Sequence, residues 1–314
     1  MKPEDGYIFY IINPKAGASG LKTTSRKFIS YLSSKGFRVQ ILTTSCLRDG
    51  FEFSRSAAES KDCAMVVVVG GDGVIREVAD GLKGNGKPLL IIPGGTENLL
   101  ANELGFDEKV ETIIKTFEDG FTRPMDLGSV NGKSFTSVAG FGFDGEIVKR
   151  VSGQRSGHID YLDYVWPIWR TFWDYKFEPM KVEVDGETIY QGRAMVFVGN
   201  ISRYAIGLEI LHYADFGDGL LDVCVYKCSN RPHLVKHSIL TILKKHSGRG
   251  DVIYRQGKQI RISSHSSDIA TEIDGDPGPS LPVEIKVIPQ AITLLVPKGA
   301  RPAGIRTRLI RALG

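Results

Sequence analysis

The chain has 314 residues, of which 42% are apolar and 24% charged, and it is long enough to bury two cores. No stretch contains the roughly 18 uninterrupted apolar residues that a membrane-spanning helix requires, and the N-terminus lacks the basic and apolar regions of a signal peptide. We therefore expect a cytoplasmic protein that meets a membrane, if at all, only from its surface. Cys46, Cys63, Cys224 and Cys228 show no C-x-x-C spacing, so we expect four reduced, packed thiols.

The first third of the chain alternates between strand and helix patterns. Residues 64–69 form a continuous apolar run rich in β-branched side chains, which is typical of a buried parallel strand. Strands are predicted over residues 7–12, 37–43, 64–69 and 88–92, and helices over residues 21–34, 52–60, 72–82 and 97–104. This alternation predicts an α/β domain whose open parallel sheet is covered by helices on both faces, a three-layer arrangement.

A second pattern begins after Thr122-Arg123-Pro124. Short alternating strands are predicted over residues 135–139, 181–184, 193–198, 221–226, 259–263, 283–288 and 292–296. Turn signals such as Asp185-Gly186 separate these strands, and helical segments are predicted over residues 159–175 and 232–246. The sequence therefore predicts an α/β domain over residues 1–124 and a mostly antiparallel β domain over residues 125–297.

Three glycine-rich turns of the first domain each follow a predicted strand. They are Asn13-Pro14-Lys15-Ala16-Gly17, Gly70-Gly71-Asp72-Gly73 and Pro93-Gly94-Gly95-Thr96-Glu97-Asn98. The carboxyl ends of parallel strands share one edge of the sheet, where α/β folds bind their ligands. Glycines let the backbone approach a phosphate, and the N–H groups at the start of the next helix point at the anion. Asp72 could cap that helix or hold a magnesium ion through water. A nucleotide site is predicted, although no Walker sequence G-x-x-x-x-G-K-[ST] occurs.

These motifs and their order resemble the diacylglycerol kinase and sphingosine kinase catalytic family. The resemblance extends over residues 7–297 and includes four further motifs, Met125-Asp126-Leu127-Gly128, Ala139-Gly140-Phe141-Gly142-Phe143-Asp144, Asp218-Gly219-Leu220-Leu221-Asp222 and Asp274-Gly275-Asp276-Pro277. It implies an N-terminal α/β nucleotide domain and a C-terminal β-sandwich lipid domain with the cleft between them. It also implies that residues 298–314 return to the first domain.

The resemblance further implies roles for individual residues. The residues expected around ATP are Asn13, Pro14, Lys15, Ala16, Gly17, Thr44 (or Thr43), Gly70, Gly71, Asp72, Gly73, Gly95, Thr96 and Asn98. Asp218 would hold a structural Mg²⁺ together with carbonyl ligands from Asp215 and Leu220. Asp276 stands where the family has its catalytic base, and Asp274 would assist or orient it. A plain turn is the competing interpretation of Asp274-Gly275-Asp276-Pro277, because each of its residues favours turns.

Two residues depart from the family pattern. Val74 follows Gly-Gly-Asp-Gly where the family has threonine, and Asp276 replaces the usual glutamate. We predict an ATP-dependent lipid kinase that phosphorylates the hydroxyl of a lipid such as diacylglycerol or a sphingoid base. The alternatives are a kinase of a soluble substrate, of the NAD kinase or phosphofructokinase type, and a catalytically weak homologue that binds nucleotide or lipid.

Two segments bear on contact with a membrane. Residues 159–175 contain all three tryptophans at helical spacing, which fits either core packing or a membrane interface. Residues 298–314 contain five basic and no acidic side chains, against a net charge of +4 for the whole chain. This tail suits an anionic membrane surface or is a solvated helix. Nucleic acid is not expected, because no aromatic side chains interleave with the charges.

Overall fold

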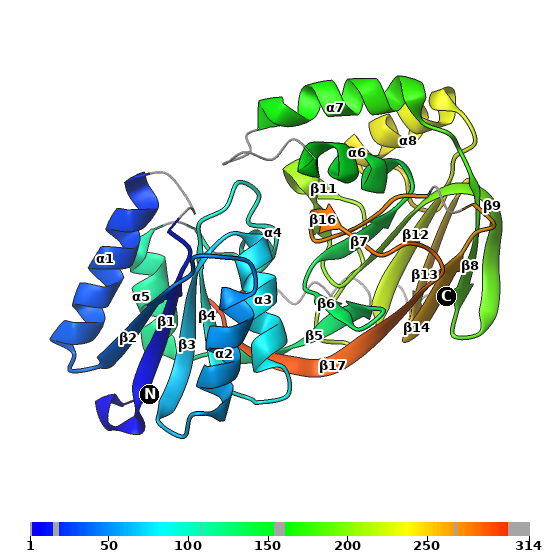
Figure 1. Cartoon of the computed structure of the whole chain (residues 1–314). Coiled ribbons are helices and arrows are strands. Elements are labelled where there is room, and N and C mark those ends of the chain that lie inside the picture. Colours follow the sequence, from blue (N-terminus) through cyan, green and yellow to red (C-terminus); the bar gives the residue numbers. More distant parts are fainter. Residues whose placement is uncertain (1, 15–18, 108, 154–160, 267–268, 301–314) are drawn as a thin grey trace. The chain divides into compact units, whose positions relative to one another are not determined.

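The computed structural model describes residues 2–14, 19–107, 109–153, 161–266 and 269–300 (Figure 1). These residues form two compact units. One contains the chain up to Leu127 and the segment from Pro289, and the other is Gly128–Ile288. The assignment of nucleotide and lipid roles to the two predicted domains stays a prediction. Residues 301–314 lie outside the described residues, so the predicted return of the tail stays a prediction as well.

The first unit is built on a parallel sheet with the strand order β2–β1–β3–β4–β17. Its strands are β1 (Tyr7–Ile12), β2 (Arg38–Thr43), β3 (Cys63–Gly70), β4 (Pro88–Pro93) and the end of β17 (Val283–Leu295). Its helices are η1 (Pro3–Asp5), α1 (Ser19–Ser34), α2 (Asp49–Glu59), α3 (Asp72–Leu82), α4 (Leu99–Glu103) and α5 (Val110–Asp119). Every pairing in this order is parallel, which confirms the predicted α/β class.

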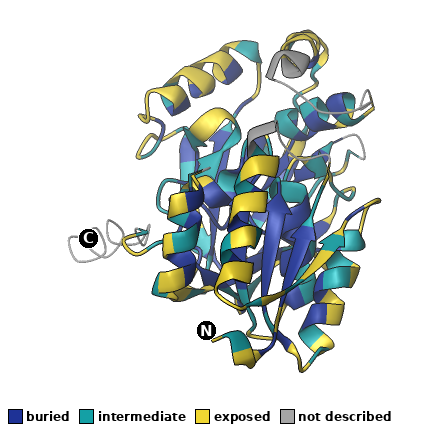
Figure 2. Cartoon of the chain, turned by 90° about the vertical axis from the view of Figure 1, so that its left-hand side faces the viewer, coloured by how far each residue is buried: buried dark blue, intermediate teal, exposed yellow. Residues whose placement is uncertain are grey.

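Helices cover both faces of this sheet. α1 packs beside α5 on one face, whereas α2 and α3 pack together on the other (Figure 1). Figure 2 shows the central strands in dark blue between helices with yellow outer sides. On α1, Phe28 and Leu32 are fully buried, and the ring of Phe28 lies 6.4 Å from that of Tyr10. The periodicity of α1 therefore matches the face that it buries.

Two predicted helices, α2 and α4, begin at other residues than expected, and in each case a local contact or backbone angle determines where the helix begins. α3 has the predicted bounds, but α2 begins earlier than predicted. It does so because the carboxylate of Glu77 accepts hydrogen bonds from the N–H groups of Arg48 (2.9 Å) and Gly50 (3.2 Å). α4 begins later than predicted, because Asn98 has a left-handed φ of 50°. α5 is not among the predicted helices, although its buried residues Ile113 and Phe117 have helical spacing.

The second unit is a sandwich of antiparallel strands in which β9 (Glu187–Gly199) belongs to both sheets. Residues of β9 up to Arg193 pair with β8, and those from Ala194 onward pair with β12. The other strands are β5 (Thr122–Val130), β6 (Lys133–Phe135), β7 (Val138–Phe141), β8 (Pro179–Val184), β12 (Leu221–Lys227), β13 (Val252–Gly257), β14 (Gln259–Ser263), β15 (Thr271–Ile273) and β16 (Asp276–Pro277), with a separate pair β10 (Arg203–Tyr204) and β11 (Leu208–Glu209). Phe135, Val196 and Ile260 contribute to the buried core. The expected β-sandwich is confirmed.

Helices pack on one side of the second unit. They are α6 (Phe143–Ser152), α7 (Tyr161–Asp174) and α8 (Arg231–Ile242), with the short η2 (Ala205–Gly207). Phe172 of α7 and Leu234 of α8 join a second apolar cluster with Phe197 and Tyr226. Two of these helices are predicted by the sequence and α6 is not. The predicted strands 283–288 and 292–296 form one strand, β17, in which Gln290 has a φ of 48°.

All four cysteines are free thiols, as expected, but they are not all packed. Cys63, Cys224 and Cys228 are buried, whereas Cys46 is exposed, so the expectation of packing is wrong for Cys46. Over the described stretches of the chain, no helix has the length and apolar character needed to cross a bilayer.

Candidate active site

Two of the predicted glycine turns meet backbone to backbone in the first unit. The N–H of Gly94 donates to the carbonyl oxygen of Gly70 at 2.9 Å. A Cβ atom placed on Gly95 would lie 2.6 Å from the Cα atom of Gly71, and one on Gly71 would lie 3.0 Å from the Cα atom of Gly95. No side chain fits at Gly95 without moving backbone. The ends of β3 and β4 therefore form one continuous surface of glycine backbone.

Asn98 and Asp72 hold this surface in place. The side-chain oxygen of Asn98, which is buried, accepts hydrogen bonds from the N–H groups of Gly94 (3.1 Å) and Gly95 (2.7 Å), and its amide donates to the carbonyl of Gly95 (2.8 Å). Asp72, at the start of α3, accepts a hydrogen bond from the N–H of Leu100 at 3.3 Å. Asn98 and Asp72 therefore link the two glycine turns to the start of α4, and these contacts hold the loops in position.

The ends of β1 and β2 lie beside the Gly70 turn. The N–H of Asn13 donates to the carbonyl of Val69 at 3.0 Å, and the N–H of Thr44 donates to the carbonyl of Ile12 at 2.9 Å. A Cβ atom on Gly70 would lie 3.5 Å from Cβ of Asn13. Asn13, Thr44 and Gly70 therefore share the carboxyl edge of the sheet.

The structure describes only some of the other residues expected around ATP. Pro14 and Thr96 are exposed, and a Cβ atom on Gly73 would meet no atom within 4 Å. The predicted nucleotide residues Lys15, Ala16 and Gly17 lie outside the described residues. These assignments stay predictions.

Val74, the departure from the family pattern, is a packing residue. Its side chain is 9% exposed. Its Cγ1 atom lies 2.2 Å from the place of a Cβ on Gly70, and its Cγ2 atom lies 3.2 Å from the place of a Cβ on Gly50. Val74 therefore fills the space between the glycine turn and α2. A threonine would have the same branching here, so the substitution conserves the shape of the turn.

In the second unit, Asp276 follows a tight turn of the β15–β16 hairpin. Asp274 and Gly275 form this turn with φ angles of 48° and 77°, and positive φ at both central residues defines a type I′ hairpin turn. Asp276 pairs with Ile273 on β15 and is half-buried. The turn interpretation of this segment is therefore correct for Asp274 and Gly275, and it leaves Asp276 on the strand that follows.

Asp274 anchors the hairpin to a neighbouring segment. One carboxylate oxygen accepts from the N–H (2.8 Å) and hydroxyl (3.1 Å) of Thr136, and the other accepts from the N–H groups of Ser137 (2.9 Å) and Val138 (3.1 Å). Thr136 and Ser137 are fully buried. These contacts make Asp274 a positioning residue for the strand that carries Asp276.

Two buried carboxyl groups to which the sequence assigns no role, Asp144 and Glu272, lie close to this hairpin. An added Cβ on Gly140 would be 2.3 Å from Asp144 Oδ2 and 2.8 Å from Glu272 Oε1, so the two carboxyls meet over this glycine. Burial raises the pKa of Asp144 to about 6. Burial and the neighbouring Asp144 raise the pKa of Glu272 well above its usual value. The two residues are 128 positions apart in the chain, so no local signal reveals the pair.

The predicted magnesium loop has its acidic side chains turned toward its own backbone. Asp215 accepts from the N–H of Gly217 at 3.2 Å, and Asp218 accepts from the N–H of Leu220 at 3.0 Å. The pKa of the neighbouring Asp222 is raised to about 7, mainly by burial, with the carboxylates of Asp218 and Asp215 adding to the effect. The residues described contain no group of three or more His, Cys, Asp or Glu side chains arranged for a metal. The loop concentrates negative charge that suits a hard cation, and a Mg²⁺ held by one carboxylate and carbonyls stays a prediction.

The segment Gly140-x-Gly142-x-x-Gly145 has the spacing of a dinucleotide-binding fingerprint. β7 pairs in antiparallel fashion with both β9 and β15, whereas that fingerprint belongs to a parallel strand–helix–strand unit. Gly145 instead allows close packing, because a Cβ there would lie 2.4 Å from the carbonyl oxygen of Ala270. These glycines therefore serve the packing of α6.

Comparisons with known proteins agree with this architecture. Residues 7–130 match the diacylglycerol kinase catalytic domain, and residues 137–296 match the YegS C-terminal NAD kinase beta sandwich-like domain. A diacylglycerol kinase of Bacillus subtilis is 26% identical over 92% of this chain and 95% of its own length. One of Mycobacterium tuberculosis is 29% identical over 94% and 96%. The crystal structure of a diacylglycerol kinase from Bacillus anthracis superposes with a TM-score of 0.74, at 25% identity, covering 94% of this chain and 98% of that one.

An α/β unit with joined glycine turns, followed by a β-sandwich of the NAD kinase type, defines a two-part kinase architecture. The two domain matches, and the relatives that align over nearly their whole length, all point to the same family of kinases. The chain belongs to the diacylglycerol kinase catalytic family.

Proposed function

We propose that the protein is an ATP-dependent lipid kinase that transfers the γ-phosphate of ATP to the hydroxyl of a lipid such as diacylglycerol or a sphingoid base. The observation that carries the proposal is the backbone contact between the turns at Gly71 and Gly95. A surface without side chains beside a helix N-terminus suits the phosphates of a nucleotide. Relatives named diacylglycerol kinase, which match more than nine-tenths of the chain, support the lipid acceptor.

In the proposed reaction, Asp276 acts as general base. Its carboxylate accepts the proton of the lipid's primary hydroxyl, the hydroxyl oxygen forms a bond to the γ-phosphorus, and the bond from that phosphorus to the bridging oxygen of ADP breaks. A Mg²⁺ bound with ATP would neutralise charge on the phosphates. Asp274 positions the base through Thr136 and Ser137. Asp218, with the carbonyls of Asp215 and Leu220, would hold a structural Mg²⁺.

A kinase of a soluble substrate is the second candidate. It is favoured by the match of residues 137–296 to a sandwich domain of the NAD kinase type. A catalytically weak homologue is the third candidate, because Asp276 has a shorter side chain than the family's glutamate. The burial of Val74 against Gly70 weakens the case for lost activity at that position. We also propose a cytoplasmic protein that contacts the membrane peripherally.

Radiolabelled ATP incubated with extracted membrane lipids, and separately with NAD and sugars, tests the three candidates. The lipid kinase predicts label in the organic phase. The Asp276→Ala variant should abolish this label, because no carboxylate then accepts the proton within the roughly 3 Å that general-base catalysis requires. Asp276→Glu should retain transfer. Full activity of Asp276→Ala would show that another group is the base.

A further inference from the structure

Helix α8 buries polar side chains and exposes apolar ones, which is the reverse of the usual arrangement in a surface helix. Its buried residues are Leu234, His237 and Thr241. Its outward residues Val235, Ile239 and Ile242, with Leu243 directly after its end, form an aliphatic stripe at helical spacing and are 44%, 51%, 62% and 55% exposed. Surface helices normally turn their apolar stripe toward the core. α8 instead presents its stripe to the outside of its unit.

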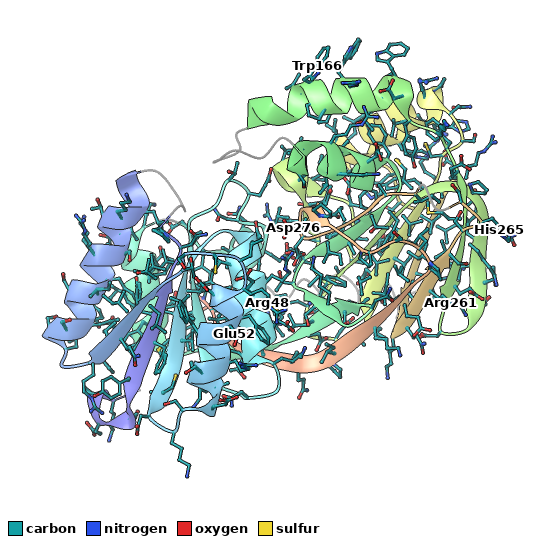
Figure 3. All side chains as sticks on the ribbon, in the orientation of Figure 1. Arg48, Glu52, Trp166, Arg261, His265 and Asp276 are labelled. Carbon is teal, nitrogen blue, oxygen red and sulfur yellow. The ribbon has the colours of Figure 1, made fainter. Side chains whose placement is uncertain are left out.

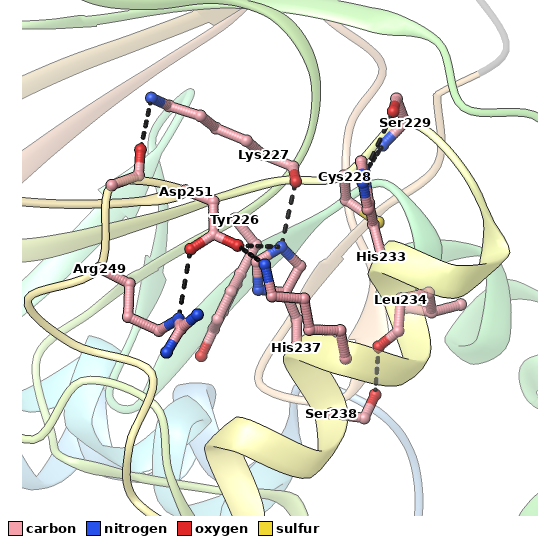
Figure 4. Close-up of polar contacts among 12 residues, drawn as sticks. Tyr226, Lys227, Cys228, Ser229, His233, Leu234, His237, Ser238, Arg249 and Asp251 are labelled. Atoms are coloured by element: carbon pink, nitrogen blue, oxygen red, sulfur yellow. Dashed lines mark hydrogen bonds and ion pairs between the residues drawn. The ribbon is translucent and has the colours of Figure 1, made fainter.

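Polar contacts on the inner side fix α8 in this orientation. The Nε2 atom of His237 lies 3.0 Å from the carbonyl oxygen of Lys227, and the hydroxyl of Thr241 lies 2.8 Å from that of Tyr226. Figure 4 shows His237 between Lys227 and Asp251, and His237 is 1% exposed. Rotating the helix to bury its stripe would break these contacts and expose Leu234 of the core. The outward stripe is therefore a fixed feature.

Helix α7 presents a second apolar face. Its inward residues Thr171 and Phe172 are buried or half-buried against the unit. Its outward tryptophans are Trp166, Trp169 and Trp173, which are 63%, 55% and 52% exposed. Figure 3 shows Trp166 pointing away from the body of the protein. Core packing, one of the two interpretations of this segment, is therefore wrong for the tryptophans.

Arg231, the first residue of α8, joins the two helices. Its Nε atom donates to the carbonyl of Phe172 at 2.9 Å, and a second guanidinium nitrogen donates to the carbonyl of Trp173. The guanidinium also lies over the ring of Trp173, 5.8 Å from its centroid. Both apolar faces thus belong to one hydrogen-bonded pair of helices within the same unit, and the two helices lie at the same end of that unit in Figure 1.

Positive charge surrounds the aliphatic stripe. Residues 223–250 contain six basic and no acidic side chains, Lys227, Arg231, Lys236, Lys244, Lys245 and Arg249. Lys236 and Arg249 both pair with Asp251, and Lys244 pairs with Glu209 at 2.8 Å, so two acidic side chains balance part of this charge. Exposed aliphatic residues flanked by lysines are typical of helices that lie in the surface of an anionic bilayer. Tryptophan also favours the membrane interface.

We propose, building on the lipid-kinase function proposed above, that α7 and α8 form a docking surface for anionic lipid bilayers. The docking surface consists of Trp166, Trp169, Trp173, Val235, Ile239 and Ile242. The tryptophan rings and aliphatic side chains enter the headgroup region, and Lys244 and Lys245, which follow the end of α8, meet lipid phosphates. The surface would hold the protein where a lipid substrate is embedded.

Intrinsic fluorescence gives a direct test on the unmodified protein, because every tryptophan of the chain lies in α7. Vesicles of phosphatidylglycerol and phosphatidylcholine in equal parts should shift the emission to shorter wavelength and protect it from acrylamide. Pure phosphatidylcholine should have a smaller effect, and added salt should weaken binding to the anionic vesicles. Sedimentation of the protein with anionic vesicles without any change in emission would overturn the proposal, because another surface would then be the contact.

Variants test the stripe of α8. Ile239→Gln with Ile242→Gln should weaken binding to anionic vesicles about tenfold or more, since both apolar side chains then resist burial in the interface. Lys244→Gln with Lys245→Gln should weaken it about fivefold for each charge removed. The matched control is Ile41→Gln with Leu47→Gln, which replaces two residues 50% and 86% exposed in the other unit, and it should bind like the unmodified protein.

Two readouts separate docking from catalysis and from self-association. All variants should phosphorylate a short-chain lipid dissolved as monomers as fast as the unmodified protein does. If no lipid is phosphorylated but vesicle binding depends on the stripe, the docking surface stands and the proposed function fails. If the Ile239→Gln, Ile242→Gln variant binds vesicles normally, the docking surface is wrong. Loss of a dimer in sedimentation velocity with unchanged vesicle binding would instead identify the stripe as an interface between copies.

Discussion

The carboxylate of Asp274 offers a sharp test of how the hairpin positions Asp276. Asp274→Ala removes the acceptor for the hydroxyl of Thr136 and for three backbone N–H groups, two of which belong to fully buried residues. Each buried donor left without a partner costs about 1–3 kcal/mol. Water can reach part of the vacated space, so we expect a loss of about 3–5 kcal/mol in the free energy of unfolding. Urea denaturation followed by circular dichroism measures it.

Asp185 provides a matched control, because it forms the same kind of turn in the β8–β9 hairpin. Asp185 and Gly186 have φ angles of 48° and 87°, and the Asp185 carboxylate accepts hydrogen bonds from the N–H groups of Lys258 (3.0 Å) and Gln259 (2.8 Å). These groups are exposed, so water replaces the lost acceptor and Asp185→Ala should cost only about 1 kcal/mol. No predicted site residue lies on that hairpin.

The two variants should also differ in activity. A displacement of about 1 Å can cost about a hundredfold in rate, so Asp274→Ala should lower lipid phosphorylation by about that factor when equal amounts of folded protein are compared. Asp185→Ala should leave the rate unchanged. Equal rates for Asp274→Ala and the unmodified protein would refute the reasoning, because Asp276 would then not depend on this turn.

Three further changes probe the glycine turns and the buried carboxyls. Val74→Thr should lower the free energy of unfolding by about 1 kcal/mol, because it buries a hydroxyl against Gly70, and it should change the rate less than about threefold; a large gain in rate would show that the family's threonine contacts substrate. Gly95→Ala should weaken ATP binding, measured by calorimetry, because its Cβ would lie 2.6 Å from the Cα atom of Gly71; unchanged affinity would separate the joined turns from the nucleotide. The raised pKa of Asp144, about 6 against an ordinary 3.8, means that stability present below about pH 4 is lost as pH rises toward 6. That loss is about 1.4 kcal/mol for each unit of the shift. Asp144→Asn should reduce it, with the raised pKa of Glu272 causing the loss that remains, and an unaltered pH profile between 4 and 6 would contradict the buried pair.

Local patterns predict the elements whose signals lie within their own residues. The continuous apolar run of β3 and the bounds of α3 are examples, since a buried strand and an amphipathic helix are each defined by adjacent side chains. Contacts between distant residues are beyond such patterns. Asp126 accepts a hydrogen bond from the N–H of Gln290 at 2.7 Å, which fixes the irregularity that makes β17 resemble two strands.

The candidate site also depends on contacts between distant residues, which local patterns do not predict. The resemblance to the family identifies Asp274 and Asp276 as a motif, but only the structure shows that the Asp274 carboxylate is directed to Thr136–Val138. The pair formed by Asp144 and Glu272 depends on the absence of a side chain at Gly140. Helix α8 is predicted correctly as a helix, yet its outward aliphatic stripe contradicts the usual rule that apolar faces are buried.

Phosphoryl transfer from ATP to a lipid tests the central claim most directly. The protein is incubated with γ-labelled ATP, Mg²⁺ and diacylglycerol or a sphingoid base in mixed micelles, and the organic phase is counted. We predict label in the lipid, and its loss in the Asp276→Ala variant at an unchanged free energy of unfolding. Label confined to NAD or to another soluble acceptor, or ATP binding without transfer to any lipid, would contradict the assignment of a lipid kinase.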